Sequence, residues 1–378
     1  MVESNDAQNV AANNQICKPQ LERKIVTSRQ RILTVLDGGV PDRVPLHDTY
    51  WETTIDRWRS EGLPKGSAAE EFFGTDEIVF LQGDYSMQFP ERVIEQADSL
   101  RTYWDSNGAL RKDLRTHEGW TSQWLDFTIK TRDDWSKHRH KMSFDRSRIA
   151  ETTLSKFERA RSRGQFVCYS AHACFHPTWE RIGMETELIL MLEQPDFIHD
   201  MYAAHVQLVI DIFDELIKLG VEFDGARLAD DLGYHTAPLI SPKLYHDLVL
   251  PNHKKLCDHF SNYGLKTILH SDGNIAPLID HFLEAGITGL HPLEAKAGLD
   301  ARSIKARYGK DLVLFGNIDV RKLAGTREDI EEEIVTKVPA AKKNGGYIYH
   351  SDHSVPNNVS LDNYKFAIEL VKKYGSYD

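Results

Sequence analysis

The chain has 378 residues, of which 41% are hydrophobic and 27% are charged, and its formal net charge is −11. No apolar run approaches the roughly 20 residues of a transmembrane helix, which excludes a membrane-spanning role. The acidic balance offers no cluster of Lys and Arg for phosphates, which argues against nucleic-acid binding.

The amino-terminal 25 residues are polar and rich in Asn, Gln and Ala, without the basic, apolar and small-residue order of a secretory signal. We expect a mobile or loosely docked tail over residues 1–25 and one domain over 26–378. The four cysteines, Cys17, Cys168, Cys174 and Cys257, form no CxxC pair and no disulfide framework. These features indicate a protein of the reducing cytoplasm.

Short β-rich apolar runs alternate with longer segments of helical periodicity from residue 26 onward, which predicts βαβ units around a parallel sheet. The expected strands, in chain order, cover 43–47, 77–82, 165–170, 224–229, 266–270, 286–290, 312–316 and 347–350. The main expected helices cover 51–60, 197–219, 241–263, 275–285, 302–308, 327–343 and 361–374. Eight such strands can close into an α/β (β/α)8 barrel, or TIM barrel.

One segment breaks this rhythm. Residues 92–132 contain the turn signal Ser106-Asn107-Gly108 between runs with Thr, Tyr, Leu and Trp, which predicts an antiparallel insertion on a βα loop. We interpret it as an insertion and not as a separate domain.

Polar clusters follow several of the expected strands directly. They are Asp230-Asp231, His270-Ser-Asp272, Glu294, Gly316-Asn317-Ile-Asp319 and His350-Ser-Asp352-His353. In a parallel barrel these strand ends meet on one face, where the active sites of such enzymes lie. We therefore expect one polar pocket at the carboxyl-terminal mouth.

A metal site is the sharpest prediction for this pocket. His270 and Asp272 occupy alternate positions of an extended segment, so their side chains point to the same side, and an imidazole with a carboxylate suits zinc. Glu294 and His353 can complete the ligand set. An isolated His-x-Asp is more often a histidine held within a loop, but the convergence of several strand ends favours the metal.

His350 and His353 compete for one role, because one can bind the metal while the other supports it or only packs in the loop. We favour His353 as the ligand and expect Asp352 to orient one of the two rings.

Further residues after the strands either line a substrate pocket or pack on the barrel rim. They are Tyr50 and Trp51 after the first strand, Asp84 after the second, His172 and His176 after the third, and Asp231 and Asn317. The sequence leaves both readings open. It contains no GxSxG elbow, P-loop or GxGxxG turn, which argues against acyl, nucleotide and dinucleotide chemistry.

The chain resembles the uroporphyrinogen decarboxylase superfamily, and within it the cobalamin-linked methyltransferases. The resemblance spans about residues 28–375 and rests on Arg31-Ile-Leu-Thr-Val-Leu-Asp37-Gly-Gly, Pro41-Asp-Arg43-Val-Pro45, Asp230-Asp231 with Ile240-Ser-Pro242, Pro251, Gly316-Asn-Ile-Asp319 and His353-Ser-Val-Pro356. The decarboxylases carry an Arg-rich motif after the first strand that holds the propionates of the tetrapyrrole. Leu46-His-Asp-Thr-Tyr-Trp51 stands there instead, which disfavours that substrate.

The resemblance also bears on the metal and the reaction. The methyltransferases hold zinc with His-x-Cys, a Glu and a final Cys, a pattern that falls on His270, Asp272, Glu294 and His353 with both cysteines replaced. An oxygen and nitrogen ligand set makes a harder Lewis acid, which suits demethylation of an ether such as a methoxylated aromatic. Asp230, Asp84 or a pocket histidine such as His350 could supply a proton to the leaving oxygen.

We therefore expect a zinc-dependent demethylating methyltransferase whose methyl acceptor is cobalamin carried by a partner corrinoid protein, because the Asp-x-His-x-x-Gly signature of a cobalamin domain is absent. One alternative is a metal-free decarboxylase or lyase on the same barrel, with His353 and Asp230 as acid and base. Another is a small-ligand binding protein on a degenerate barrel. The sequence does not decide the identity of the methyl donor or of the metal, or whether the methyl acceptor is a corrinoid protein, free cobalamin or a folate. It also leaves the oligomeric state open, with a homodimer as one possibility.

Overall fold

A computed structural model describes residues 26–116 and 119–377. The predicted tail over residues 1–25 lies outside the described residues. Within the described part of the chain, parallel strands form one curled sheet in the order β1-β6-β7-β8-β9-β10-β11. These strands are β1 (Ile78–Leu81), β6 (Phe166–His172), β7 (Gly225–Ala229), β8 (Thr267–His270), β9 (Gly289–His291), β10 (Val313–Phe315) and β11 (Tyr347–Ile348).

The first expected strand is irregular but occupies its place in the barrel. Leu46 forms a parallel bridge with Tyr349 beside β11, and its carbonyl accepts a hydrogen bond from the Asp76 amide just before β1. This segment therefore lies between the first and last strands of the sheet. Pro45 has no N–H for a ladder, which explains why the pairing stays isolated. The predicted (β/α)8 barrel is confirmed, and this irregular segment occupies the position of the eighth strand.

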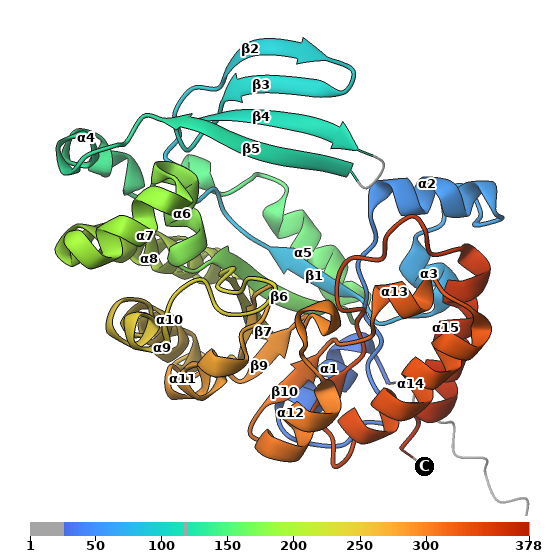
Figure 1. Ribbon diagram of the computed structural model, residues 1–378. Coiled ribbons are helices and arrows are strands. Elements are labelled where there is room, and N and C mark those ends of the chain that lie inside the picture. The colour runs from blue at the N-terminus through green and yellow to red at the C-terminus, as the bar shows by residue number, and fades with distance from the viewer. Residues whose placement is uncertain (1–25, 117–118, 378) are drawn as a thin grey trace, which may run out of the picture.

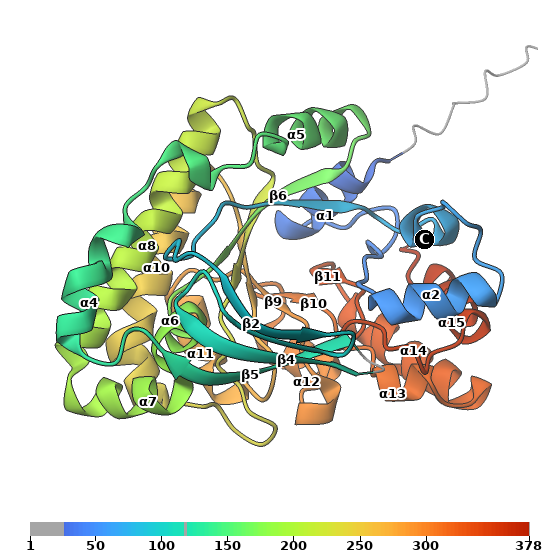
Figure 2. The same cartoon turned by 90° about the horizontal axis from the view of Figure 1, so that it is seen from above.

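Helices surround the strands, as the view from above shows (Figure 2). They are α1 (Ser28–Leu36), α2 (Glu52–Ser60), α3 (Ala69–Phe73), α4 (Arg132–His138), α5 (Thr153–Ser162), α6 (Phe175–Ile182), α7 (Met184–Glu193), α8 (Pro195–Lys218), α9 (Pro242–Leu244), α10 (Leu250–Ser261), α11 (Ile279–Glu284), α12 (Ala301–Tyr308), α13 (Val320–Leu323), α14 (Arg327–Ala341) and α15 (Leu361–Tyr374). Short 3-10 turns cover Arg139–Met142, Arg146–Arg148, Ala276–Leu278 and Ala295–Ala297. No helix among the described residues has the length and apolar character needed to cross a membrane.

The expected helix over 241–263 is interrupted. A π-helical turn over Tyr245–Val249 separates α9 from α10. Pro251 at the start of α10 has no backbone N–H to close the turn before it, which explains the break in the α-helical ladder.

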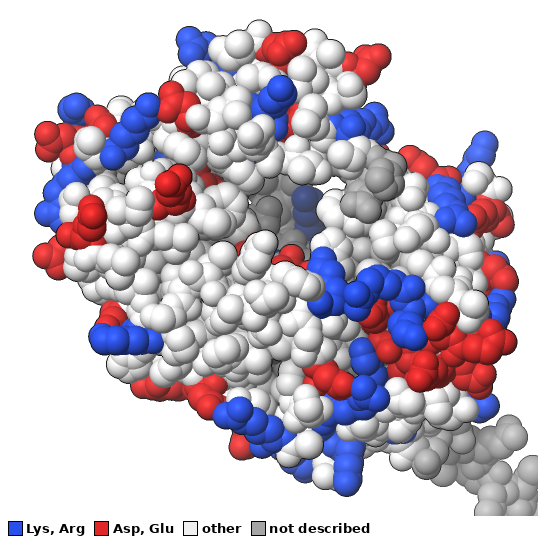
Figure 3. Space-filling view, in the orientation of Figure 1, with Lys and Arg blue, Asp and Glu red and all other residues white. Residues whose placement is uncertain are grey.

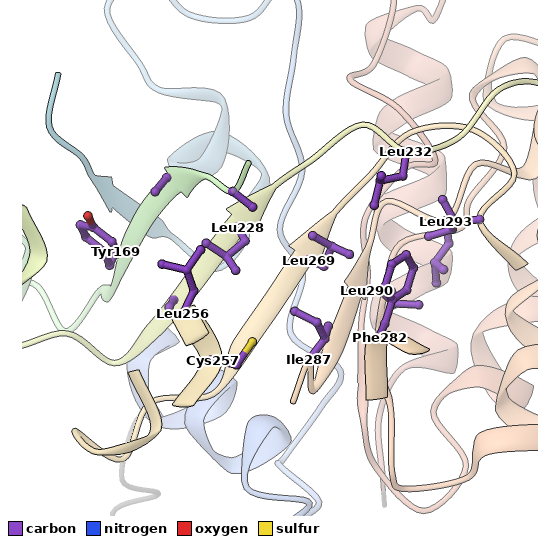
Figure 4. Close-up of a cluster of buried hydrophobic side chains, with 14 of the residues drawn as sticks. Tyr169, Leu228, Leu232, Leu256, Cys257, Leu269, Phe282, Ile287, Leu290 and Leu293 are labelled. Carbon is purple, nitrogen blue, oxygen red and sulfur yellow. The ribbon is translucent and has the colours of Figure 1, made fainter. Parts of the chain in front are cut away.

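Side chains alternate between two cores because successive strand residues point to opposite faces. Leu228, Leu269 and Leu290 face outward and pack with Leu256, Phe282 and their neighbours on α10 and α11 (Figure 4). The inward residues form a second, smaller core that α1 closes at the amino-terminal end. Its members are Ile32, Val35, Leu36, Phe166, Cys168, Ile268, Val313, Phe315 and Ile348.

The predicted antiparallel insertion is confirmed. It contains β2 (Arg92–Ala97), β3 (Leu100–Trp104), β4 (Ala109–Thr116) and β5 (Gly119–Phe127), paired in chain order. This sheet lies above the barrel (Figure 1) and packs on α6, where the Trp124 and Trp179 rings meet edge to face at 4.9 Å. The insertion therefore covers one side of the barrel mouth.

Candidate metal centre at the barrel mouth

The inward side chains change from apolar to polar toward the carboxyl ends of the strands. On β8, Ile268 belongs to the inner core while His270, two residues later, lines a cavity of about 270 Å³ at the mouth. Figure 3 shows a hollow beneath the antiparallel sheet with a basic side chain visible in its depth. The mouth cavity is lined by Thr49, Trp51, Arg227, His270, Asp272, His291, Pro292, His350, His353 and Ser354.

The four predicted metal ligands meet at this mouth as two overlapping groups. The ligand atoms of Asp272, Glu294 and His353 all lie within 4.8 Å of one another, and so do those of Asp231, His270 and Asp272. Asp272 belongs to both groups, whereas His270 and His353 share the cavity but not a group. Asp231, expected to bind substrate, therefore lies beside the predicted metal ligands.

The distances around His270 resemble those between zinc ligands. Its Nε2 lies 3.7 Å from Asp231 Oδ1 and 3.9 Å from Asp272 Oδ1. Donor atoms around a tetrahedral zinc are about 3.3–3.5 Å apart, so small rotations of these side chains would close the set.

Two glycines hold these carboxylates together, because the loops after β7 and β8 touch through their backbones. A Cβ on Gly233 would lie 2.3 Å from the Asp272 carbonyl oxygen, and one on Gly273 would lie 2.4 Å from the Gly233 carbonyl carbon. The Gly273 amide also donates to Glu294 Oε2 at 2.9 Å. Backbone packing thus brings Asp272 toward both Asp231 and Glu294.

The electrostatics of the cluster favour a bound cation. Burial, reinforced by the negative charges of Asp231 and Glu294, raises the pKa of Asp272 to about 7. Asp272 Oδ1 is buried and has no hydrogen-bond partner in the part of the chain that the structure describes. An unpartnered buried carboxylate oxygen is costly unless something positive faces it, so the donors present fit a divalent metal.

His270 has the protonation state that a ligand needs. Burial, with the nearby Arg227 cation, lowers its pKa, so the ring is neutral. Its Nδ1 lies 2.7 Å from His291 Nδ1, and a proton on His270 Nδ1 would leave the Nε2 lone pair free toward the carboxylates. A neutral imidazole with carboxylates is a ligand set typical of zinc.

His350 lines the inner wall of the cavity and is almost wholly buried. Burial lowers its pKa to about 4. Asp352 does not orient it, because the Asp352 carboxylate accepts hydrogen bonds from the Ala295 and Val320 amides. The partner of His350 Nδ1 is the Ser351 carbonyl oxygen at 2.5 Å, and Asp48 Oδ1 lies farther away at 3.5 Å.

The histidines after β6 form the opposite side of the mouth. His172 is exposed and stacks on His176 at 4.9 Å, and His176 Nδ1 lies 2.9 Å from Asp231 Oδ2. Burial lowers the pKa of His176, but the contacts with Asp231 and Glu180 outweigh burial and raise this pKa to about 10. The His176 ring also packs on Trp179, the residue that contacts the insertion sheet.

The two aromatic residues after the first strand have different surroundings. Trp51 lines the cavity, and its ring centroid lies 5.8 Å from that of His353. Tyr50 packs edge to face on Trp58, and its hydroxyl lies 3.2 Å from that of Tyr364. Trp51 is therefore placed to contact substrate and Tyr50 to support the wall.

Three other predicted residues do not line the mouth cavity. Asp230 is fully buried, and its carboxylate accepts hydrogen bonds from the Phe175 and His176 amides and contacts His253 Nε2 at 2.8 Å. Asn317 is fully buried and bridges the Leu293 and Leu299 carbonyls and the Ala301 amide. Asp84 lines a separate cavity of about 680 Å³ and caps the Ser86 amide. These placements suit positioning roles better than contact with a substrate at the mouth.

Sequence reasoning missed Arg227 and His291, which both line the mouth. Arg227 lies in the middle of an otherwise apolar strand, Gly225–Ala229, at an inward position. A charged residue at the inward parity of a barrel strand was the available signal.

Comparisons with known proteins agree with this architecture. The family model described as "Uroporphyrinogen decarboxylase (URO-D)" matches residues 180–374. The uroporphyrinogen decarboxylase of Psychromonas ingrahamii is 27% identical over 184 residues, covering 47% of this chain and 49% of that protein. The Synechocystis protein of the same name is 27% identical over 187 residues, covering 47% of this chain and 46% of that protein. The chain thus spans about half the length of these curated relatives.

A solved structure extends the likeness over the whole fold. The structure titled "methyltransferase from Methanosarcina mazei" superposes with a TM-score of 0.63 at 15% identity, covering 93% of this chain and 99% of that one. At this identity the likeness concerns the fold alone. The match over residues 180–374, together with the barrel, shows that the chain belongs to the uroporphyrinogen decarboxylase family.

Proposed function

We propose that the chain is a zinc-dependent methyltransferase. It would take the methyl group of a small methylated substrate, such as a methoxylated aromatic ether, and pass it to the cobalt of a corrinoid protein. The observation that carries this proposal is Asp272, which belongs to both ligand groups at the barrel mouth and whose Oδ1 has no hydrogen-bond partner among the described residues. A methyltransferase with the same fold supports the reaction class.

The proposed metal would be held by His270, Asp272, Glu294 and His353 if the two groups that share Asp272 close around one ion, with Asp231 beside them. When bound, zinc would supply Lewis acidity at the ether oxygen, which is otherwise a poor leaving group. Lys296 Nζ lies 2.9 Å from Glu294 Oε1, and this contact, with the Gly273 amide on Oε2, fixes the Glu294 carboxylate.

The remaining residues would bind and orient the substrate. Trp51 and His353 form one wall, and aromatic rings of this kind suit a flat substrate. Among the residues expected to supply a proton, His350 lines the cavity while Asp230 and Asp84 do not. With its pKa lowered to about 4 by burial, His350 is neutral at pH 7, so we propose that it hydrogen-bonds the substrate without protonating it.

We further propose that residues 26–378 act as one domain in the cytoplasm. The three described cysteines, Cys168, Cys174 and Cys257, are buried free thiols, which suits a reducing compartment. The partner that carries cobalamin would approach the mouth from the side that the antiparallel sheet leaves open (Figure 1).

Metal-free decarboxylation is the second candidate, because the family and the curated relatives carry that name. The tetrapyrrole of those enzymes bears many carboxylates and needs several cationic partners. Arg227 is the one cation among the residues that line the mouth cavity. This lining favours a smaller and less charged substrate.

Metal analysis and methyl transfer together test the proposal. The full chain, purified without chelators, should contain about one zinc, and zinc should fall to background in His270→Ala and Glu294→Ala. The matched control is His281→Ala on α11, a surface histidine paired with Glu284, which should retain zinc. Methoxylated aromatics should then convert cob(I)alamin to methylcobalamin, followed by its visible spectrum. Full zinc loading of the two ligand variants, or turnover without metal, would contradict the proposal.

A further inference from the structure

A second cavity lies inside the barrel, directly below the mouth. It measures about 250 Å³, and its walls are mainly apolar, including Ile78, Phe80, Phe166, Ile268 and Phe315. It shares Thr49, Arg227, His291 and His350 with the mouth cavity, so the two spaces are contiguous. We call this space the inner chamber.

Arg227 is the cation that lines both spaces. Its Nη1 lies 3.4 Å from Ser170 Oγ, and its guanidinium carbon lies 5.6 Å from the Phe80 ring centroid. Among the described residues no carboxylate forms an ion pair with it. Its charge is therefore available to a ligand from either space.

Two other buried cations of the described chain have carboxylate partners, whereas buried Arg148 bonds to backbone carbonyls and buried Arg181 to the Tyr85 carbonyl and His205. Arg31 bonds to both Asp42 and Asp76, at 2.7 and 2.5 Å, and Lys337 lies 2.6 Å from Glu333. A buried charge without a counterion or a full set of hydrogen bonds is costly, and proteins keep such groups mainly where they serve binding. Arg227 differs from Arg31 and Lys337 in lacking a carboxylate partner among the described residues, and from Arg181 in lining both cavities.

The histidines around Arg227 do not compensate its charge. Burial lowers the pKa of His47 and of His350 to about 4. These rings are neutral at pH 7 and contribute no anion. The carboxylates whose charges act on Arg227, Asp231 and Asp272, belong to the proposed metal site.

We propose that Arg227 binds the carboxylate of a small monocarboxylate substrate whose apolar body fills the inner chamber. The planar guanidinium can hold a carboxylate by two parallel hydrogen bonds, which fixes orientation as well as position. A cavity of about 150 Å³ already holds a benzene ring, so the chamber has room for one substituted ring. This inference rests on the proposed function in taking the ligand to be the methyl donor.

Calorimetric titration of the full chain with benzoate and with benzamide tests the proposal. Benzamide keeps the ring and loses the charge. Benzoate should bind at least tenfold more tightly than benzamide, and Arg227→Gln should weaken benzoate by about 10- to 100-fold while leaving benzamide nearly unchanged. Arg227→Lys, which keeps charge but loses the planar fork, should give an intermediate loss.

Two further variants test the volume of the inner chamber and the effect of removing an unrelated arginine. Ile268→Phe adds volume at the chamber wall and should weaken both ligands, since it narrows the space for the ring. Arg307→Gln removes an exposed arginine on α12 paired with Asp280 and is the matched control, with unchanged affinity for both ligands. Melting curves show that each variant is folded.

Titrations with and without added zinc distinguish this inference from the metal proposal. If no zinc binds and no methyl transfer occurs, but benzoate still requires Arg227, the proposed reaction fails and the carboxylate site stands. Equal affinity for benzoate and benzamide overturns the inference. So does benzoate binding that depends on zinc and is insensitive to Arg227→Gln and Arg227→Lys.

Discussion

The contact between Gly233 and Gly273 allows a sharp test of how the mouth is assembled. Gly273 has a φ of +79°, and a Cβ there would lie 2.4 Å from the Gly233 carbonyl carbon. Replacing it with alanine therefore adds a backbone clash to the strain of a left-handed conformation. The loops after β7 and β8 must separate to relieve that clash, which moves Asp272 away from Asp231.

The two contributions can be separated with controls in the same chain. Gly264 has a φ of +74° and open space around its Cβ position, so Gly264→Ala reports conformational strain alone. We expect it to lower the free energy of unfolding by about 1 kcal/mol. Gly273→Ala should lower it by about 3 kcal/mol or more, because overpacking against backbone adds to the strain.

Urea unfolding and zinc titration measure the two consequences. Gly273→Ala should weaken zinc at least tenfold, because a metal site loses affinity when its ligands are displaced. Gly264→Ala should leave zinc affinity unchanged, because Gly264 lies between α10 and β8. It is therefore at the amino-terminal end of β8, opposite the mouth. Equal stability loss in the two variants, with zinc affinity retained in Gly273→Ala, would refute the role of this loop contact.

Two further predictions concern buried carboxylates. Asp230→Asn should lower the free energy of unfolding by about 2–3 kcal/mol, because the Asp230 carboxylate accepts hydrogen bonds from the amides at the start of α6. The zinc content should stay unchanged. Loss of methyl transfer without loss of stability would instead indicate a direct chemical role for Asp230. Burial raises the pKa of Glu187 well above its usual value, so its folded state holds a proton that the unfolded state has released. Its contribution to stability should decline as pH rises above about 4.5 toward the folded pKa, and Glu187→Gln, which keeps the shape beside Tyr202, should flatten that decline in urea melts at pH 5 to 8. Parallel pH profiles for both proteins would contradict this reading.

Much of the fold follows from local patterns. Short apolar runs at 224–229 and 266–270, followed by helical periodicity, predict β7 and β8 because a parallel strand buried on both faces is apolar throughout. The turn signal at Asn107-Gly108 predicts the antiparallel insertion for a similarly local reason. The irregular first strand is less predictable, since its pairing depends on Tyr349, just after β11 and far away in the sequence.

The sequence by itself determined which residue types end each strand, and hence that His270, Asp272, Glu294 and His353 would reach one mouth. Only the tertiary structure decided that these residues fall into two overlapping ligand groups. Side-chain separations of a few ångströms depend on loop packing, such as that of Gly233 on Gly273. It also separated the neighbours Asp230 and Asp231, since adjacent residues at a strand end point in opposite directions, one into the helical layer and one toward the mouth. The free charge of Arg227 was likewise invisible in the sequence, because a counterion can come from any part of the chain.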